Sequence, residues 1–207
     1  MNKQFIALIS VAGVVGLLGG LWLATQGSDS DDQFAQCRSS TFAGGAGAIG
    51  GPFELVNGDG ATVTDAEVIT EPSILYFGYT FCPDVCPLDV ARNVVSVEVL
   101  EEQGMTVTPV FISIDPKRDT PEVVRDFADN MHERMIGLTG TDEQVAAASK
   151  AYRTYYKTHE GDEDYYLVDH STFSYLVLPD HGFVEFFRRE IAPEQMAETI
   201  SCFVENA

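Results

Sequence analysis

The chain has 207 residues, which is enough for one globular domain and some additional chain, because domains contain about 100–200 residues. It has 32 acidic residues against 12 Lys and Arg, which gives a formal net charge of −20. A surface this acidic repels phosphate groups, so it excludes nucleic acid and anionic lipid headgroups as main partners and favours a cationic partner or a metal ion.

The N-terminal segment 5–24 is apolar and carries no charge. About 20 such residues cross the core of a bilayer as a helix. Lys3 precedes the segment and three aspartates follow it, and this charge bias places the C-terminal part of the chain outside the cytoplasm. The residues around Ala24 match a cleavage site poorly. We therefore expect an uncleaved transmembrane helix at 5–24 rather than a signal peptide, with residues 1–4 in the cytoplasm.

Residues 25–51 are polar and rich in glycine, with the runs SDSDD and GGAGAIGG, which is typical of a flexible stalk. Residues 52–207 then form the folded domain. The sequence therefore predicts a single-pass protein of the inner (cytoplasmic) membrane, whose C-terminal domain lies in the periplasm or an equivalent space.

Hydrophobic periodicity and turn residues predict the first half of the domain. It begins with a hairpin, in which strands 53–56 and 61–64 flank the turn sequence NGDG. A strand–helix–strand unit follows and implies neighbouring parallel strands. Its three parts are 74–77, 88–103 and 110–114.

The second half begins at Thr120, which precedes Pro121 as expected for the start of a helix. The remaining predicted elements are a short strand at 135–138, a helix from Thr141, a loop or hairpin at 157–167, strands at 173–178 and 183–187, and a helix at 193–204. This order predicts one domain, α/β or α+β, with a central mixed sheet flanked by helices.

Cys82 and Cys86 lie between the most apolar strand and the following helix, where sites form in open α/β sheets. Pro87 suits the first helical turn and places Cys86 near the helix start, whose free N–H groups stabilise a thiolate. Two thiolates on one turn can close a disulfide or bind one soft cation. The spacing CxxxC fits a metal better than the tighter CxxC of redox enzymes, and an inert structural pair is the plainer alternative.

His170 stands just before a predicted strand, at the place where thioredoxin-like redox enzymes have a cis-proline. The sequence has no proline between Pro121 and Pro179. In such a fold this loop approaches the cysteine loop, so His170 can add an imidazole to two thiolates. That low-coordinate set suits Cu(I), whereas Zn(II) usually recruits a fourth ligand. The other three histidines lack such a context, and we expect them at the surface.

Four segments of the domain together resemble the Sco/SenC family of membrane-anchored copper chaperones, including its bacterial PrrC-like members: GGPFELVNGDGATVTD, YFGYTFCPDVCP, PVFISIDPKRDTP and LVDHSTFSYLV. The resemblance extends from about residue 50 to the C-terminus. It implies a thioredoxin-like domain with an N-terminal β-hairpin. It also implies insertion of copper, Cu(I) with Cu(II) as the alternative, into the binuclear copper centre of cytochrome c oxidase subunit II or a related copper protein.

The resemblance also implies roles for individual residues. It makes Cys82, Cys86 and His170 the metal ligands. Asp115 ends the second buried strand and lies near the site in the family, although a loop cap is an equally simple role for it. Asp84, between the two cysteines, would tune the charge at the site or is simply a solvated carboxylate.

Cys37 in the stalk and Cys202 in the last predicted helix are the remaining cysteines. An even number of cysteines outside the cytoplasm allows a bridge between them. Such a bridge would fasten the stalk to the domain by closing a long loop. Free thiols and an intermolecular disulfide are the alternatives.

Three functions use this set of residues. The leading hypothesis is a membrane-tethered metallochaperone that passes copper on by ligand exchange, without enzymatic turnover. The alternative is a thiol-disulfide oxidoreductase or redox sensor, in which Cys82 and Cys86 are redox-active and His170 is not needed. A peroxiredoxin-like peroxidase would need an activating arginine beside Cys82, and none lies near it in the sequence.

Overall fold

The structure, a computed structural model, describes residues 19–20, 32–38, 46–161 and 165–207. The expected cytoplasmic residues and nearly all of the expected transmembrane segment lie outside these ranges. Within them, none of the helices combines the length and the apolar character needed to cross a membrane. The chain divides into two compact units, Met1–Gln36 and Cys37–Ala207, and the second contains the folded domain.

The domain alternates strands and helices in the predicted order. Its elements are η1 (Ala46–Ala48), β1 (Glu54–Asn57), β2 (Thr62–Thr64), α2 (Asp65–Val68), β3 (Ser73–Gly78), α3 (Val85–Glu102), β4 (Thr108–Ser113), α4 (Pro121–Met131), β5 (Ile136–Thr139), α5 (Asp142–Ala151), β6 (Tyr156–Thr158), β7 (Val168–His170), β8 (Ser174–Leu178), β9 (Gly182–Phe187) and α6 (Pro193–Glu205).

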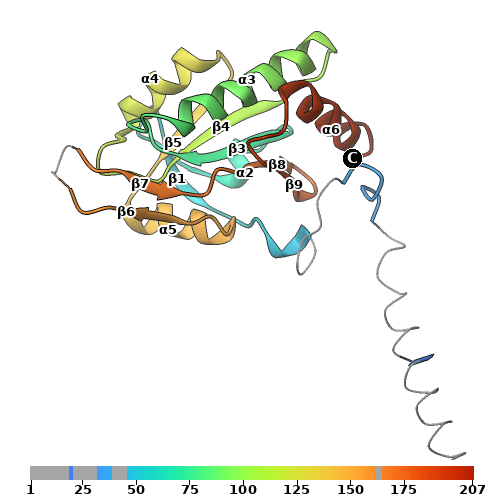
Figure 1. The fold of residues 1–207 in the computed structure, drawn as a ribbon, viewed down its shortest axis with the longest axis horizontal. Helices are drawn as coiled ribbons and strands as arrows, with labels where there is room; N and C mark the ends of the chain where they lie inside the picture. The colour runs from blue at the N-terminus through green and yellow to red at the C-terminus, as the bar shows by residue number, and fades with distance from the viewer. Residues whose placement is uncertain (1–18, 21–31, 39–45, 162–164) are drawn as a thin grey trace, which may run out of the picture. The chain divides into compact units, whose positions relative to one another are not determined.

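Seven strands form one mixed sheet in the order β2-β1-β5-β4-β3-β8-β9. The central strands β3, β4 and β5 are parallel to one another, and the outer strands pair antiparallel. Figure 1 shows α3, α4 and α6 on one side of this sheet and α5 on the other. The hairpin β6–β7 is a separate two-stranded sheet. The predicted α/β class with a central mixed sheet is confirmed.

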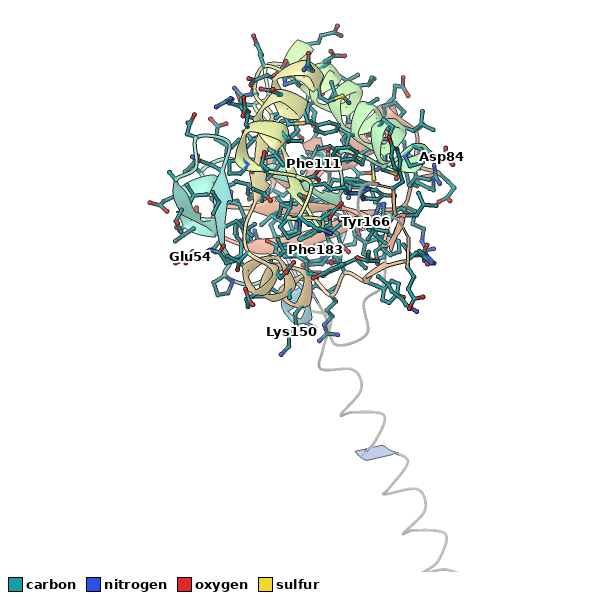
Figure 2. All side chains as sticks on the ribbon, turned by 90° about the vertical axis from the view of Figure 1, so that its left-hand side faces the viewer. Glu54, Asp84, Phe111, Lys150, Tyr166 and Phe183 are labelled. Carbon is teal, nitrogen blue, oxygen red and sulfur yellow. A yellow bond between two sulfur atoms is a disulfide. The ribbon has the colours of Figure 1, made fainter. Side chains whose placement is uncertain are left out.

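The apolar runs in the sequence become the central strands because helices cover both faces of the sheet. Every residue of β3 and of β4 is buried. Figure 2 shows Phe111 of β4 in the interior of the domain. The centre of its ring lies 4.5 Å from the centre of the Phe127 ring in α4. Parallel strands that are buried on both faces have continuous hydrophobic sequences, and these runs predicted the positions of β3 and β4.

Helix caps place most boundaries where the sequence predicts them. The Thr120 hydroxyl accepts a hydrogen bond from the Val123 N–H, and Thr141 and Gln144 form a capping box at the start of α5. The helix α3 begins at Val85, earlier than expected, so that Cys86 lies inside its first turn. The four-residue helix α2 was not predicted.

The carboxyl ends of the three parallel strands meet at Asp119, a fully buried residue. Its carboxylate accepts hydrogen bonds from the N–H and hydroxyl of Thr80, just after β3, and from the hydroxyl of Ser113, the last residue of β4. Its backbone carbonyl accepts one from the hydroxyl of Thr139, which ends β5. One residue thus joins the strand ends from which the loops of the candidate site emerge, with its carboxylate at β3 and β4 and its backbone carbonyl at β5.

The folded unit includes residues that the sequence assigns to the stalk. Gly50 donates a backbone hydrogen bond to Ala151, and Ile49 packs against the hydrophobic core. A disulfide joins Cys37 to Cys202 in α6, with the two Cα atoms 5.6 Å apart and a sequence separation of 165. The domain therefore begins before residue 52, because a short apolar contact and a covalent bond hold the preceding segment to it.

The disulfide gives a prediction for stability. Replacing Cys37 and Cys202 together by serine should lower the free energy of unfolding by about 2–5 kcal/mol, because the bridge restricts a long loop of the unfolded chain. Urea unfolding of the oxidised full chain measures this. The single variant Cys37→Ser should lose the same amount, since either change removes the bond. A change within about 0.5 kcal/mol, typical of a surface substitution, would contradict the prediction.

Candidate metal centre

The two cysteines of the CxxxC motif lie at the sheet edge defined by Asp119. Cys82 is in the loop between β3 and α3, and Cys86 is the second residue of α3. Both are free thiols and both are buried. The backbone N–H of Cys86 points to Cys82 Sγ at 3.3 Å. The first turn of the helix therefore turns both sulfur atoms toward the same place.

Gly78, the last residue of β3, makes room for the Cys86 sulfur. A Cβ atom at this position would lie 3.1 Å from Cys86 Sγ and 2.8 Å from Cε1 of Tyr76. Real Cβ atoms essentially never approach as closely as the second distance, so any larger residue would displace one of these side chains. The glycine is required here by packing and not by backbone conformation.

His170 reaches the cysteines from the hairpin β6–β7, where it ends β7. Its Nε2 lies 3.1 Å from Cys86 Sγ, and its Nδ1 lies 2.9 Å from the carbonyl oxygen of Ser171. A carbonyl can only accept, so Nδ1 carries the proton and the lone pair of Nε2 faces the sulfur. The ring is held edge-on by Tyr76 and Tyr79, with ring centroids 6.2 and 5.8 Å away.

The donor atoms of Cys82, Cys86 and His170 all lie within 4.8 Å of one another. Within the described part of the chain, this is the one group of three or more Cys, His, Asp or Glu residues close enough to hold a metal ion. Two sulfurs and one imidazole nitrogen are soft ligands, so the group can bind a soft cation.

Burial sets the protonation of this group. It lowers the pKa of His170, which keeps the imidazole neutral and able to donate its lone pair. It also raises the pKa of the Cys86 thiol. The expectation that the helix start stabilises a Cys86 thiolate is therefore wrong: the helix-start N–H of Cys86 points to Cys82 Sγ, and removal of the Cys86 thiol from water has the largest effect on its pKa. A bound cation would have to replace the proton of this thiol.

Neither aspartate singled out from the sequence joins the group of three. Asp84 is the N-cap residue of α3 and is exposed, and Figure 2 shows it at the rim of the domain. Asp115 is buried, but its carboxylate accepts hydrogen bonds from Tyr166 Oη and from Arg118 Nε, each at 2.5 Å. It therefore contacts the segment that leads into β7 instead of the sulfur atoms.

Arg118 and Tyr166 form a latch on the hairpin that carries His170. The Arg118 guanidinium lies 3.6 Å from the centre of the Tyr166 ring and donates to the Tyr166 carbonyl. Two residues further along, the Val168 N–H donates to Tyr79 Oη. Sequence reasoning missed this latch. The motif DPKRDTP was the available signal, but nothing in it shows that its arginine contacts residues nearly 50 positions later.

The other histidines lie away from the candidate site. His159 and His181 are exposed, and His159 Nε2 lies 2.8 Å from the Asp169 carboxylate. The prediction of a surface residue is wrong for His132, whose side chain is only 8% exposed and lies 3.7 Å from Glu101. The end of α4 packs it against α3, a contact that its position in the sequence does not reveal.

An open groove of about 510 Å³ is lined by two of the three candidate ligands, Cys82 and His170, while Cys86 lies beneath it, fully buried. Apolar and acidic side chains share its walls. The lining residues are Tyr79, Cys82, Pro83, Asp84, Val85, Leu167, Val168, Asp169, His170 and Thr172. Leu167 is exposed, and so is Phe81 in the cysteine loop. The site is thus reached from one side, over a rim that a partner protein can contact.

The fold and this site define a thioredoxin-like protein with a buried Cys–Cys–His group. The sequence model of the SCO1/SenC family matches residues 43–205. Protein SenC of Rhodobacter capsulatus is 50% identical over 205 residues, which are 99% of this chain and 92% of that protein. The mitochondrial SCO1 homolog 1 of Arabidopsis thaliana is 45% identical over 145 residues, which are 69% of this chain and 43% of that protein. The chain belongs to the SCO1/SenC family.

Solved structures agree with this assignment. Arabidopsis thaliana ScoI with copper bound has a TM-score of 0.72 and 38% identity over 76% of this chain and 99% of that one. Bradyrhizobium japonicum ScoI with copper bound has a TM-score of 0.67 and 34% identity over 74% and 98%. These matches confirm the predicted thioredoxin-like domain with its N-terminal hairpin.

The latch gives a second prediction. Tyr166→Phe removes the hydroxyl that donates to the buried Asp115 carboxylate, so the free energy of unfolding should fall by about 1–3 kcal/mol. Amide hydrogen exchange in β7 should become faster, because the hairpin loses one of its attachments. Tyr165→Phe is the matched control, since Tyr165 is 85% exposed and its hydroxyl has no such partner to lose. Equal behaviour of the two variants would show that the hydroxyl does not hold the hairpin.

Proposed function

We propose that this protein is a copper-binding metallochaperone that takes part in the assembly of cytochrome c oxidase. The observation that carries the proposal is the convergence of the donor atoms of Cys82, Cys86 and His170 within 4.8 Å of one another beside an open groove. The relatives solved with copper bound, which share this fold and family, support it.

The ligand set favours Cu(I). Two thiolates and a neutral imidazole are soft donors, and among the described residues no carboxylate joins them as a fourth. Zn(II) would usually require that fourth ligand. Cu(II) is the alternative state, and it would draw a further ligand from solvent or from a partner in the groove.

Transfer by ligand exchange suits the architecture better than catalysis does. The ligands are buried on the protein side and open to a groove on the other, so a partner can approach from the groove and replace them one at a time. The recipient would be the binuclear copper centre of cytochrome c oxidase subunit II or a related copper protein. No covalent turnover is needed, so the protein would act as a carrier and not as an enzyme.

The N-terminal part would determine where this happens. We place the anchor at residues 5–24 in the inner membrane, a stalk at 25–51 and the domain in the periplasm. The Cys37–Cys202 disulfide supports an oxidising compartment, because such bonds persist outside the cytoplasm. The position of the charges around the apolar segment supports the orientation.

A thiol-disulfide oxidoreductase is the second candidate, and the closeness of the two free thiols favours it. The backbone argues the other way, because the described residues contain no cis peptide bond, whereas thioredoxin-like redox enzymes place a cis-proline opposite the cysteines. His170 distinguishes the two functions, because copper binding needs its imidazole as a third ligand and disulfide exchange does not.

Copper titration of the reduced full chain tests the proposal. The protein should bind one Cu(I), and Cys82→Ser or Cys86→Ser should abolish tight binding. His170→Ala should weaken it more than about 100-fold, beyond the 10–100-fold typical of residues that only orient a ligand. Competition with a chromophoric Cu(I) chelator measures these affinities, and His181→Ala, in the exposed turn before β9, is the control.

Two results would overturn the assignment. Absence of Cu(I) binding to the reduced protein would overturn the proposal that it is a metallochaperone. Unchanged Cu(I) affinity in His170→Ala, together with rapid disulfide exchange by the same variant, would favour the oxidoreductase instead.

A further inference from the structure

A buried carboxylate lies beside the candidate ligands without belonging to them. Asp89 follows Cys86 by one turn of α3, so the two side chains share a face of the helix. Asp89 is 3% exposed. A buried carboxylate is costly unless it is paired, so its presence one turn from a metal ligand calls for a physical explanation.

Tyr76 links this carboxylate to the site. Its hydroxyl donates to Asp89 Oδ2 at 3.0 Å, and its ring lies edge-on against His170. The same hydroxyl is a neighbour of the Cys86 thiol: burial raises the pKa of Tyr76, and charge on Cys86 raises it further. One phenol therefore hydrogen-bonds to the carboxylate, packs against His170 and neighbours the Cys86 thiol.

The groups around Asp89 are mainly cationic. Arg189 Nε lies 3.7 Å from Asp89 Oδ1 and is partly exposed. Arg92, on the same helix, directs its guanidinium to the Arg188 carbonyl and to the side chains of Asn93 and Ser174 instead of to Asp89. Loss of the Asp89 charge would remove a nearby negative charge from both Arg189 and Arg92.

The charge of Asp89 also reaches His170. Burial lowers the pKa of His170, and the electrostatic effect of Asp89 partly opposes this. Asp89 therefore acts on one ligand through Tyr76 and on another through space.

We propose that Asp89, together with Tyr76, is a positioning residue that sets the balance between Cu(I) and Cu(II) at the Cys–Cys–His site. This inference rests on the proposed function. The buried negative charge stabilises the doubly charged ion more than the singly charged one, and it holds the Tyr76 hydroxyl beside the Cys86 thiol. The Asp89 carboxylate competes with the Cys86 sulfur for this hydroxyl, so it leaves more of the sulfur's electron density for the metal.

The test compares two Asp→Asn variants of the full chain that remove the same charge. Asp89→Asn should raise the ratio of Cu(I) affinity to Cu(II) affinity roughly tenfold, as expected for a unit charge several ångströms away at an effective dielectric constant of about 20. This corresponds to about 59 mV in a one-electron potential. Asp180→Asn, in the exposed turn between β8 and β9, should change the ratio much less.

Tyr76→Phe guards against a fold defect in Asp89→Asn, because it keeps the ring against His170 and removes only the hydroxyl. It should lower the ratio, opposite to Asp89→Asn, because the charge of Asp89 stays and loses its hydrogen-bond donor, and it should move the sulfur-to-Cu(II) charge-transfer absorption. A purely structural role would lower the thermal stability of the metal-free protein without moving that band.

The outcomes are distinguishable. If the wild-type chain binds no copper, the proposed function fails, and this inference fails with it. If the wild type binds copper and Asp89→Asn behaves like Asp180→Asn, the inference alone is overturned. A higher ratio in Asp89→Asn and a lower ratio in Tyr76→Phe, with little change in Asp180→Asn, supports it.

Discussion

The site depends on a single buried acid that is not part of it. Asp119 holds the ends of β3, β4 and β5 together through hydrogen bonds from Thr80, Ser113 and Thr139. Burial raises its pKa, while the donors around it oppose that shift. The loops that carry the cysteines and Asp115 start at these strand ends. The strand ends therefore fix the distance between the two loops without a bound ligand.

The candidate ligands come from two separate parts of the fold. The cysteines belong to the main sheet and its helix, whereas His170 belongs to the hairpin β6–β7. Asp115, Arg118 and Tyr166 attach that hairpin. A residue such as Asp115 can therefore matter for metal binding without touching the metal, because it fixes the element that carries the imidazole.

Much of the fold could be predicted from the sequence because the signals were local. Apolar runs located the buried strands, and threonine caps located α4 and α5. Cys82, Cys86 and His170 were predicted as neighbours from their loops, and the structure brings them together. Long-range contacts could not be read in this way: the Tyr76–Asp89 pair and the position of His132 depend on which helix face meets which strand. The protonation of Cys86 was misjudged because the sequence shows the helix start but not the depth of burial.

The bond between Cys37 and Cys202 also determines how the domain bears load. Tension on the chain before Cys37 reaches α6 directly through two sulfur atoms, instead of peeling β1 from the sheet one hydrogen bond at a time. The edge strand β2 and its neighbour β1 lie inside the closed covalent loop and are shielded from that pull. A pull on the chain before Cys37 would therefore leave the register of the sheet unchanged.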